Sequence, residues 1–248
     1  DLHLSLRRQR QMCIRDSPTR MGVFLYMECR MTQRLFLFDL DGTLVDSAPD
    51  LAGAMNEMLA ARGLPERPLE ELREPSGHGG PALLKAAFGM ERTDPRFEAM
   101  RQEFLERYAA RATRSSTLYP NVVQMLDRLT AAGVKLGVVT NKPQGLAEIV
   151  CEHLGLTPRM TVVVGLGPAG TALKPKPDSL IYALKLAGAK AADALYAGDS
   201  NSDGLACQPI GLPAAWVSWG CQKTPPDSGI FDYIADEPAQ LVEWALFR

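Results

Sequence analysis

The stretch that most constrains the fold is residues 35–45, where a short apolar run ends abruptly in acids. Residues 35–38 are all leucine or phenylalanine, which is typical of a strand buried on both faces of a parallel sheet. Asp39 and Asp41 then follow the strand's carboxyl end, where open α/β sheets place their ligand crevice. Two carboxylates so close together repel each other unless a cation shares them, and Gly42 lets the backbone turn toward an anion. The alternative is a strand followed by an acidic turn without a function.

Strand and helix patterns alternate from residue 118 to the C-terminus. Apolar runs predict strands at residues 134–139, 162–164, 194–197 and 214–217. Helical spacing predicts helices at residues 122–132, 144–154, 178–186, 205–208 and 239–247. This alternation predicts an α/β fold with a parallel sheet and right-handed crossovers.

The region between the first strand and this alternating part is expected to be helical throughout. Apolar spacing predicts helices at residues 47–62, 69–73, 81–88 and 94–111, with Ser47 and Asp50 as caps of the first. An all-helical insertion directly after a strand that ends in acids indicates a lid. Ordinary crossover helices are the alternative, but about seventy residues is long for one crossover.

Polar side chains follow three of the predicted strands. Besides the first pair of acids, Thr140 and Asn141 follow the second strand, and Asp199 and Asp203 follow a later one. Lys174 comes after a glycine-rich loop, and Pro175 and Pro177 directly after it stiffen the backbone. Each group alone has another explanation, as a helix cap, a turn or a solvated loop lysine. All of them in this order, at one edge of one sheet, indicate a site for a phosphate and a metal.

The ordered motifs resemble those of the haloacid dehalogenase-like (HAD) phosphohydrolases, over residues 34–248. The motifs are Asp39-Leu40-Asp41-Gly42-Thr43, Thr140-Asn141, Lys174 and Gly198-Asp199-Ser200 followed by Asp203. The resemblance implies a Rossmann-like three-layer sandwich formed by residues 31–47 and 117–248, with an all-helical cap domain at residues 48–116. Residues 46–51, 118–122 and 138–143 look like those of the phosphoglycolate phosphatase branch.

The resemblance also implies a role for each site residue. Asp39 is expected to be the nucleophile that forms an aspartyl-phosphate, and Asp41 the general acid and then base. Mg²⁺ is expected on the Asp39 carboxylate, the Asp41 backbone carbonyl and Asp199, with Asp203 orienting a metal-bound water or Lys174. The transferring phosphoryl group is expected to bind near Gly42, Thr140, Asn141 and Lys174.

The implied function is Mg²⁺-dependent hydrolysis of a small phosphorylated metabolite such as 2-phosphoglycolate. Residues 71–89 and 100–105 look as much like the N-acetylmuramic acid 6-phosphate phosphatases of cell-wall recycling, which are the alternative. A sugar phosphomutase with the same core, or a phosphate-binding protein without catalysis, is a weaker alternative. Residues 76–81, including Gly77 and Gly80, are hypothesised to close over the site and contact the substrate's other end; the alternative is a flexible loop.

The composition is that of an ordinary globular protein. The chain has 248 residues, 46% hydrophobic and 23% charged, with a net charge of −2, which gives no support for nucleic-acid or membrane binding. Five scattered cysteines indicate neither a zinc site nor a disulfide framework, so we expect a cytoplasmic protein. We expect it to be a monomer or homodimer. Residues 1–30 are basic without a sustained period and are expected to be a disordered or artefactual tail, with the true start at Met21, Met27 or Met31.

Overall fold

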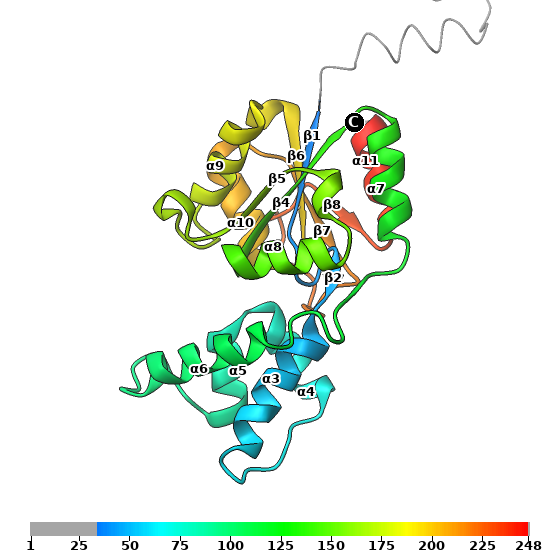
Figure 1. The fold of residues 1–248 in the computed structure, drawn as a ribbon. Helices are drawn as coiled ribbons and strands as arrows, with labels where there is room; N and C mark the ends of the chain where they lie inside the picture. The colour runs from blue at the N-terminus through cyan, green and yellow to red at the C-terminus, as the bar shows by residue number, and fades with distance from the viewer. Residues whose placement is uncertain (1–33, 248) are drawn as a thin grey trace, which may run out of the picture. The chain divides into compact units, whose positions relative to one another are not determined.

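The computed structural model describes residues 34–247, so the expectations for residues 1–30 lie outside the described part of the chain. The described residues form the expected α/β fold around a six-stranded sheet (Figure 1). Every neighbouring pair in this sheet is parallel. The strands lie in the order β5 (Met160–Leu166), β4 (Lys135–Pro143), β1 (Leu35–Phe38), β6 (Ala194–Gly198), β7 (Ala214–Val217) and β8 (Tyr233–Ala235).

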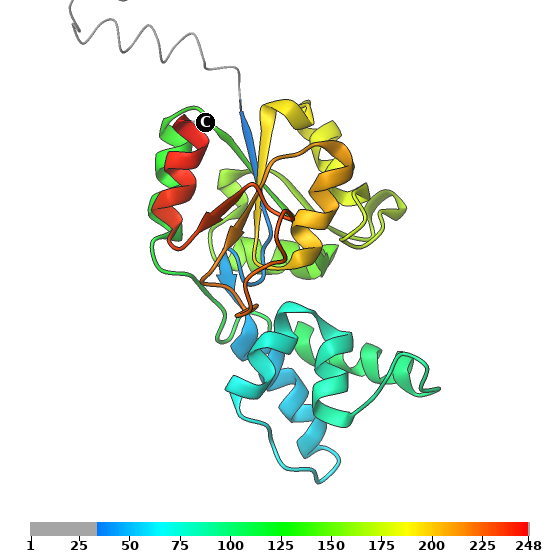
Figure 2. The ribbon, with the colours of Figure 1, turned by 180° about the vertical axis from the view of Figure 1, so that it is seen from behind.

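The central strand β1 explains the three layers. Successive side chains of a strand point to opposite faces, so Phe36 and Phe38 enter one core cluster while Leu35 and Leu37 enter the other. The first face is covered by α7 (Val122–Ala131), α8 (Gln144–His153) and α11 (Pro238–Phe247). The second face is covered by α9 (Asp178–Ala187) and α10 (Asn201–Cys207), which Figure 2 shows from behind.

The order of the strands places the functional edge. From β1 the chain passes outward to β4 and then β5, and it returns to β6 on the other side of β1. The connections therefore diverge at the carboxyl end of β1, which is where doubly wound sheets open a crevice. Asp39, which follows β1, is thus flanked by the carboxyl ends of β4 and β6.

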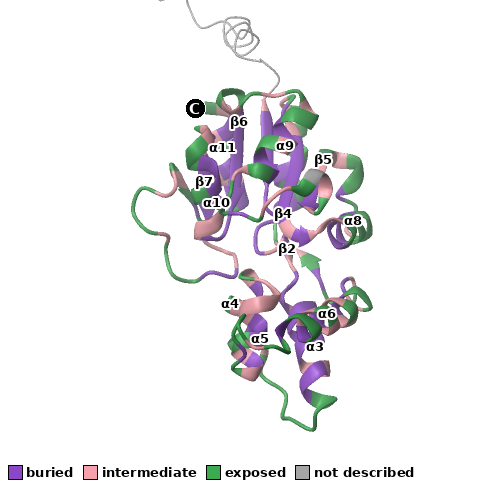
Figure 3. Cartoon of the chain, turned by 90° about the vertical axis from the view of Figure 1, so that its left-hand side faces the viewer, coloured by how far each residue is buried: buried purple, intermediate pink, exposed green. Residues whose placement is uncertain are grey.

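Residues 48–116, all of which the structure describes, contain helices and no strand. We call them the helical segment. It consists of α3 (Ala48–Ala60), α4 (Leu69–Gly77), α5 (Gly80–Phe88) and α6 (Phe97–Ala109). A two-stranded antiparallel pair, β2 (Val45–Asp46) and β3 (Thr117–Leu118), joins its two ends. The segment's helices bury one face and expose the other (Figure 3), so they share an apolar interior.

Short 3₁₀ turns complete the fold at Thr157–Arg159, Pro168–Gly170, Ala191–Asp193 and Gln208–Ile210.

None of the helices among residues 34–247 combines the length and the apolar character that crossing a membrane requires.

Two local predictions about α3 were wrong. Ser47 stands at the N-cap position but makes no capping hydrogen bond, because its Oγ donates to Asp41 Oδ1 at 2.5 Å. Asp50 does not cap the helix either, because its buried Oδ2 accepts the backbone N–H groups of Ser115 at 2.9 Å and Ser116 at 2.8 Å. Both side chains therefore hold distant segments together.

Most of the glycine-rich stretch at residues 76–81, which was expected to be a loop, belongs to helices. Ser76 and Gly77 are the last residues of α4, and Gly80 begins α5. The Ser76 Oγ donates to the Leu72 carbonyl at 2.7 Å, which keeps this hydroxyl within the helix. Only His78 and Gly79 separate the two helices.

Candidate active site

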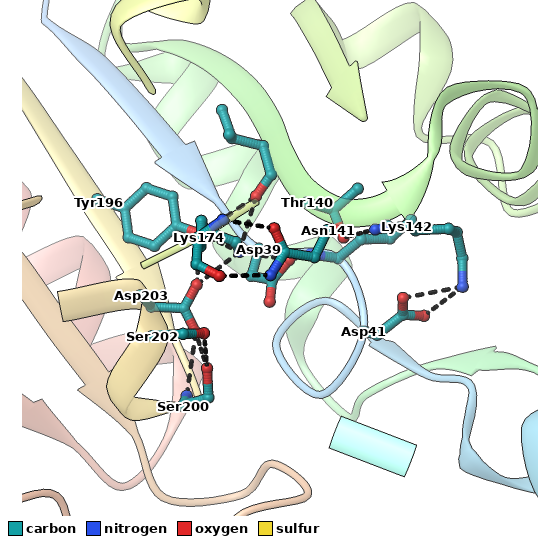
Figure 4. Close-up of polar contacts among 12 residues, drawn as sticks. Asp39, Asp41, Thr140, Asn141, Lys142, Lys174, Tyr196, Ser200, Ser202 and Asp203 are labelled. Atoms are coloured by element: carbon teal, nitrogen blue, oxygen red, sulfur yellow. Dashed lines mark hydrogen bonds and ion pairs between the residues drawn. The ribbon is translucent and has the colours of Figure 1, made fainter. Parts of the chain in front are cut away.

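Asp39 lies directly after β1 and is 9% exposed. Its backbone N–H donates to the Ala197 carbonyl at 2.9 Å, which continues the pairing of β1 with β6. Its Oδ1 accepts the Leu40 N–H at 2.7 Å and lies 3.0 Å from Lys174 Nζ. Figure 4 shows Asp39 at the centre of the polar contacts, so the sheet presents this carboxylate in a fixed place.

Three buried carboxylates converge at this edge of the sheet. One oxygen from each of Asp39, Asp199 and Asp203 lies within 4.8 Å of the others. Burial raises the pKa of Asp39 to about 6, although Lys174 lowers it, and the neighbouring acid Asp203 raises it again. Burial also raises the pKa of the Asp199 carboxyl well above its usual range, and repulsion from Asp203 and Asp39 adds to the effect.

Such a cluster fits a divalent cation. Shared coordination would relieve the repulsion that, after burial, raises these pKa values, and carboxylate oxygens are ligands that suit Mg²⁺. The Cys221 N–H donates to Asp199 Oδ2 at 2.7 Å, which orients this carboxylate. Residues from two strands far apart in the sequence therefore form the candidate metal site.

Lys174 is the buried cation of the site. Its Nζ lies 2.6 Å from Asp203 Oδ1, and it donates to the Tyr196 hydroxyl at 2.8 Å and to the Val139 carbonyl at 3.2 Å. Burial alone would lower its pKa, but the carboxylates of Asp203 and Asp39 outweigh burial and raise it. Lys174 is therefore held as a cation beside Asp39.

Asp203 has protein partners for both oxygens. Its Oδ1 is bound by Lys174 and Tyr196, and its Oδ2 accepts the N–H of Ser200 at 3.0 Å and its hydroxyl at 2.7 Å. The contacts with Ser200 also form a capping box that begins α10. This arrangement suits the expected orienting role of Asp203 toward Lys174.

Gly42 leaves space for a neighbouring side chain, and its own backbone N–H is already hydrogen-bonded. Its φ of 81° lies in the left-handed region, and a Cβ there would lie 2.1 Å from Asp199 Oδ2. Its backbone N–H donates to the Val45 carbonyl at 2.9 Å. The turn therefore needs glycine because the Asp199 carboxylate occupies the position of a side chain.

Thr140 and Asn141 lie within β4, which continues to Pro143 instead of ending at Val139 as predicted. Thr140 is buried, and its Oγ1 accepts the Lys142 N–H at 3.3 Å.

The Asn141 side chain is fastened to the backbone of Lys174. Its Nδ2 donates to the Lys174 carbonyl at 3.1 Å, and its Oδ1 accepts the Lys174 N–H at 2.8 Å. One N–H of the amide that was expected to meet a phosphoryl oxygen is therefore bonded to the backbone of Lys174.

The Asp41 carboxylate lies outside the acidic cluster. Both of its oxygens face Lys142 Nζ, at 2.9 Å and 2.8 Å (Figure 4). Burial opposes the charge of Lys142, but Asp41 and Tyr108 outweigh it and raise the lysine's pKa. The same Nζ donates to the Tyr108 hydroxyl at 2.8 Å.

Sequence reasoning missed Lys142, Tyr108 and Tyr196. Lys142 carried a signal, because a lysine next to Thr140 and Asn141 stands among polar residues already assigned to the site. Tyr196 is the one hydroxyl-bearing residue of its strand, which is a weaker signal. The spacing of Tyr108 places it on the apolar face of α6, so the sequence gave no signal for its contact with Lys142.

The end of α4 lies against the site. A Cβ on Gly77 would lie 2.7 Å from the Cys221 Cβ and 3.9 Å from Asp199 Oδ2. The helical segment therefore approaches the acidic cluster where a glycine allows close contact.

Comparison with known proteins agrees with this geometry. The family model described as haloacid dehalogenase-like hydrolase matches residues 36–217. The phosphoglycolate phosphatase of Xanthomonas campestris pv. campestris (strain 8004) is 40% identical over 212 residues, covering 85% of this chain and 95% of that protein. The N-acetylmuramic acid 6-phosphate phosphatase of Pseudomonas aeruginosa PAO1 is 35% identical over 217 residues, covering 86% of this chain and 95% of that protein.

A solved structure gives the same result for the fold. The crystal structure of a predicted phosphoglycolate phosphatase from Haemophilus somnus 129pt superimposes with a TM-score of 0.74 at 30% identity. The match covers 86% of this chain and 99% of that one. The chain therefore belongs to the haloacid dehalogenase-like hydrolase family, in its phosphoglycolate phosphatase-like branch.

Proposed function

We propose that the protein, a phosphatase of this family, hydrolyses phosphomonoesters with Mg²⁺ through an aspartyl-phosphate on Asp39. The observation that carries the proposal is the convergence of Asp39, Asp199, Asp203 and Lys174 in one buried cluster. Asp39 and Asp203, which are the farthest apart of these residues in the sequence, are separated by 203 − 39 = 164 positions. A nucleophile, a cation and acidic metal ligands in one place are the parts that phosphoryl transfer needs.

Mg²⁺ would be held by the carboxylates of Asp39 and Asp199 and by the backbone carbonyl of Asp41. When bound, the ion neutralises charge on the oxygens of the transferring phosphoryl group. Asp203 supports this site by holding Lys174 at 2.6 Å.

In the first step an oxygen of Asp39 attacks phosphorus while the bond from phosphorus to the ester oxygen breaks. Asp41 gives a proton to the leaving oxygen, so the product is an alcohol. Lys174, 3.0 Å from Asp39, lies where it can bind an oxygen of the transferring group, together with Thr140.

In the second step water attacks the phosphorus of the aspartyl-phosphate. Asp41, now a carboxylate, takes the proton of that water, and Asp39 leaves as a carboxylate. Inorganic phosphate is released, and both acids return to their starting states.

We assign residues 48–116 to a cap domain and residues 31–47 and 117–248 to the core. The approach of Gly77 to Asp199 supports a cap that closes over the site. The short connection after Gly77, up to Gly80, would then meet the part of the substrate that carries no phosphate. We expect the enzyme to act in the cytoplasm as a monomer or homodimer.

The proposed substrate is 2-phosphoglycolate, because a phosphoglycolate phosphatase is 40% identical over 95% of its own length. N-acetylmuramic acid 6-phosphate is the second candidate, because a phosphatase named for it is 35% identical over 95% of its length. Both substrates carry a carboxylate besides the phosphate, but they differ greatly in size.

The test is phosphate release from 2-phosphoglycolate, N-acetylmuramic acid 6-phosphate and a panel of sugar phosphates, each with and without Mg²⁺. We expect the highest kcat/KM with 2-phosphoglycolate, and loss of activity after chelation that added Mg²⁺ restores. A higher kcat/KM with N-acetylmuramic acid 6-phosphate would select the second candidate. Isomerisation of sugar phosphates without net phosphate release would contradict the phosphatase proposal.

A further inference from the structure

A buried lysine that the proposed mechanism does not use holds the proposed acid and base. Lys142 is 7% exposed, and its Nζ lies 2.9 Å from Asp41 Oδ1 and 2.8 Å from Oδ2. The Ser47 hydroxyl adds a third contact, at 2.5 Å from Oδ1. Because three contacts act on its two oxygens, the Asp41 carboxylate cannot turn without losing at least one of them.

The exposure of the two partners differs. The Asp41 side chain is 18% exposed and the Lys142 side chain is 3% exposed. The carboxylate is therefore the member that water or a substrate can reach, while the ammonium supports it from the protein side. Figure 4 shows the two side chains facing each other beside Asp39.

The lysine in turn is held by the helical segment. Its Nζ donates to the hydroxyl of Tyr108 at 2.8 Å and lies 4.6 Å from the centre of the same ring. Tyr108 belongs to α6 and is 1% exposed, so its position follows the packing of that helix. A lysine side chain has four rotatable bonds, and two fixed partners are what restrict it to one position.

We propose that Lys142 is a positioning residue for Asp41, and that Tyr108 links this positioning to helix α6. The inference rests on the proposed function, because it assigns Asp41 the proton transfers. A base must lie within hydrogen-bond reach of the proton that it takes, so displacement of the carboxylate slows the step that uses it.

An aryl phosphate separates the two steps. From p-nitrophenyl phosphate the leaving group departs as a stabilised phenolate, so transfer to Asp39 needs little help from the acid. Hydrolysis of the aspartyl-phosphate still needs Asp41 to take a proton from water. Loss of the positioning contact should therefore leave phosphorylated enzyme behind.

The experiment compares wild type with Lys142→Met, Lys142→Arg and Tyr108→Phe. With p-nitrophenyl phosphate and Mg²⁺ we measure the steady-state rate and, after acid quench, the fraction of enzyme that carries a phosphoryl group. For Lys142→Met we expect a steady-state rate at least about tenfold lower and a phosphorylated fraction higher than in wild type. Lys142→Arg should recover part of the rate, and Tyr108→Phe should change both readouts in the same direction by a smaller factor.

Lys85→Met is the matched control. Lys85 of α5 forms an exposed ion pair with Glu91 at 2.8 Å, so the change removes a lysine charge without touching Asp41 or Tyr108. We expect its phosphorylated fraction to match wild type. If Lys85→Met accumulates phosphorylated enzyme as Lys142→Met does, the effect does not come from the contact with Asp41 and the inference fails.

The remaining outcomes are also decisive. A Lys142→Met enzyme with the rate and phosphorylated fraction of wild type overturns the positioning role. If that variant does not fold, Tyr108→Phe decides: a phosphorylated fraction above that of wild type supports the positioning of Asp41 through Lys142, and a wild-type fraction overturns the inference. Phosphate release that persists in Asp39→Asn would instead sink the proposed function, which keeps the two failures apart.

Discussion

At the scale of single residues, the site is a problem of charge balance. Three buried carboxylates lie within 4.8 Å of one another, and Lys174 supplies one positive charge at 3.0 Å from Asp39. Burial is the main cause that raises the pKa of Asp39 to about 6; Lys174 opposes this rise, and the negative charge of Asp203 and Asp41 adds to it. A bound divalent cation would complete the balance, which is why we expect binding of Mg²⁺ and activity to fail together.

The sequence predicted the acids because they follow strands at the same edge of the sheet, and Lys174 because it follows a glycine-rich loop. It could not predict that Asn141 binds the backbone of Lys174, since this depends on where the loop after β5 returns. It also could not pair Lys142 with Asp41, because the two lie 101 positions apart.

Gly42→Ala tests the crowding of the metal site. The new methyl group would lie 2.1 Å from Asp199 Oδ2 and must displace that carboxylate. We expect Mg²⁺ affinity, measured by calorimetry, and kcat/KM each to fall at least about 100-fold.

Gly63→Ala is the control for this prediction. Gly63 also has a positive φ, of 66°, but nothing lies within 4 Å of the added methyl group. The Gly63→Ala substitution should lower the free energy of unfolding by about 1 kcal/mol through backbone strain and leave Mg²⁺ affinity unchanged. A Gly42→Ala protein with wild-type Mg²⁺ affinity would show that Asp199 is not a ligand.

At the scale of elements, strands made only of apolar residues were predicted, and strands that depend on pairing with a neighbour were not. β1 and β7 were predicted with the bounds that the structure shows. β8 has three residues, too few to show alternation, and it forms because it pairs with β7. β4 runs past Val139 into polar residues because, after an irregularity in the register, it pairs with β5 again at Pro143.

Asp50→Ala tests how the helical segment is closed. Asp50 is fully buried in α3, and its Oδ2 accepts the N–H groups of Ser115 and Ser116 and the Ser116 hydroxyl. Removing the carboxylate leaves buried donors without a partner, so we expect a loss of about 2–4 kcal/mol in the free energy of unfolding. Urea denaturation measures it.

Glu106→Ala is the comparison for this element. Glu106 lies exposed on α6 and accepts a hydrogen bond from Gln102, so its removal should leave the free energy of unfolding within about 0.5 kcal/mol. If Asp50→Ala also stays within about 0.5 kcal/mol, these hydrogen bonds do not close the segment.

At the scale of the described chain, a doubly wound sheet supplies the chemistry and a helical segment meets it at one edge. The alternation of strands and helices predicted the sheet, and the absence of strand patterns from residues 48–116 predicted the segment. The contacts between them, Tyr108 with Lys142 and Gly77 with Cys221, could not be predicted because they join faces formed only by folding.

The central claim is that Asp39 is the nucleophile, and phosphate release by Asp39→Asn measures it most directly. The comparison uses 2-phosphoglycolate with Mg²⁺, melting curves to verify folding, and Asp193→Asn, an exposed change at the opposite end of β6, as control. We predict that Asp39→Asn loses at least about 10³-fold in kcat while Asp193→Asn keeps wild-type activity. A folded Asp39→Asn enzyme within about tenfold of wild type would contradict the account.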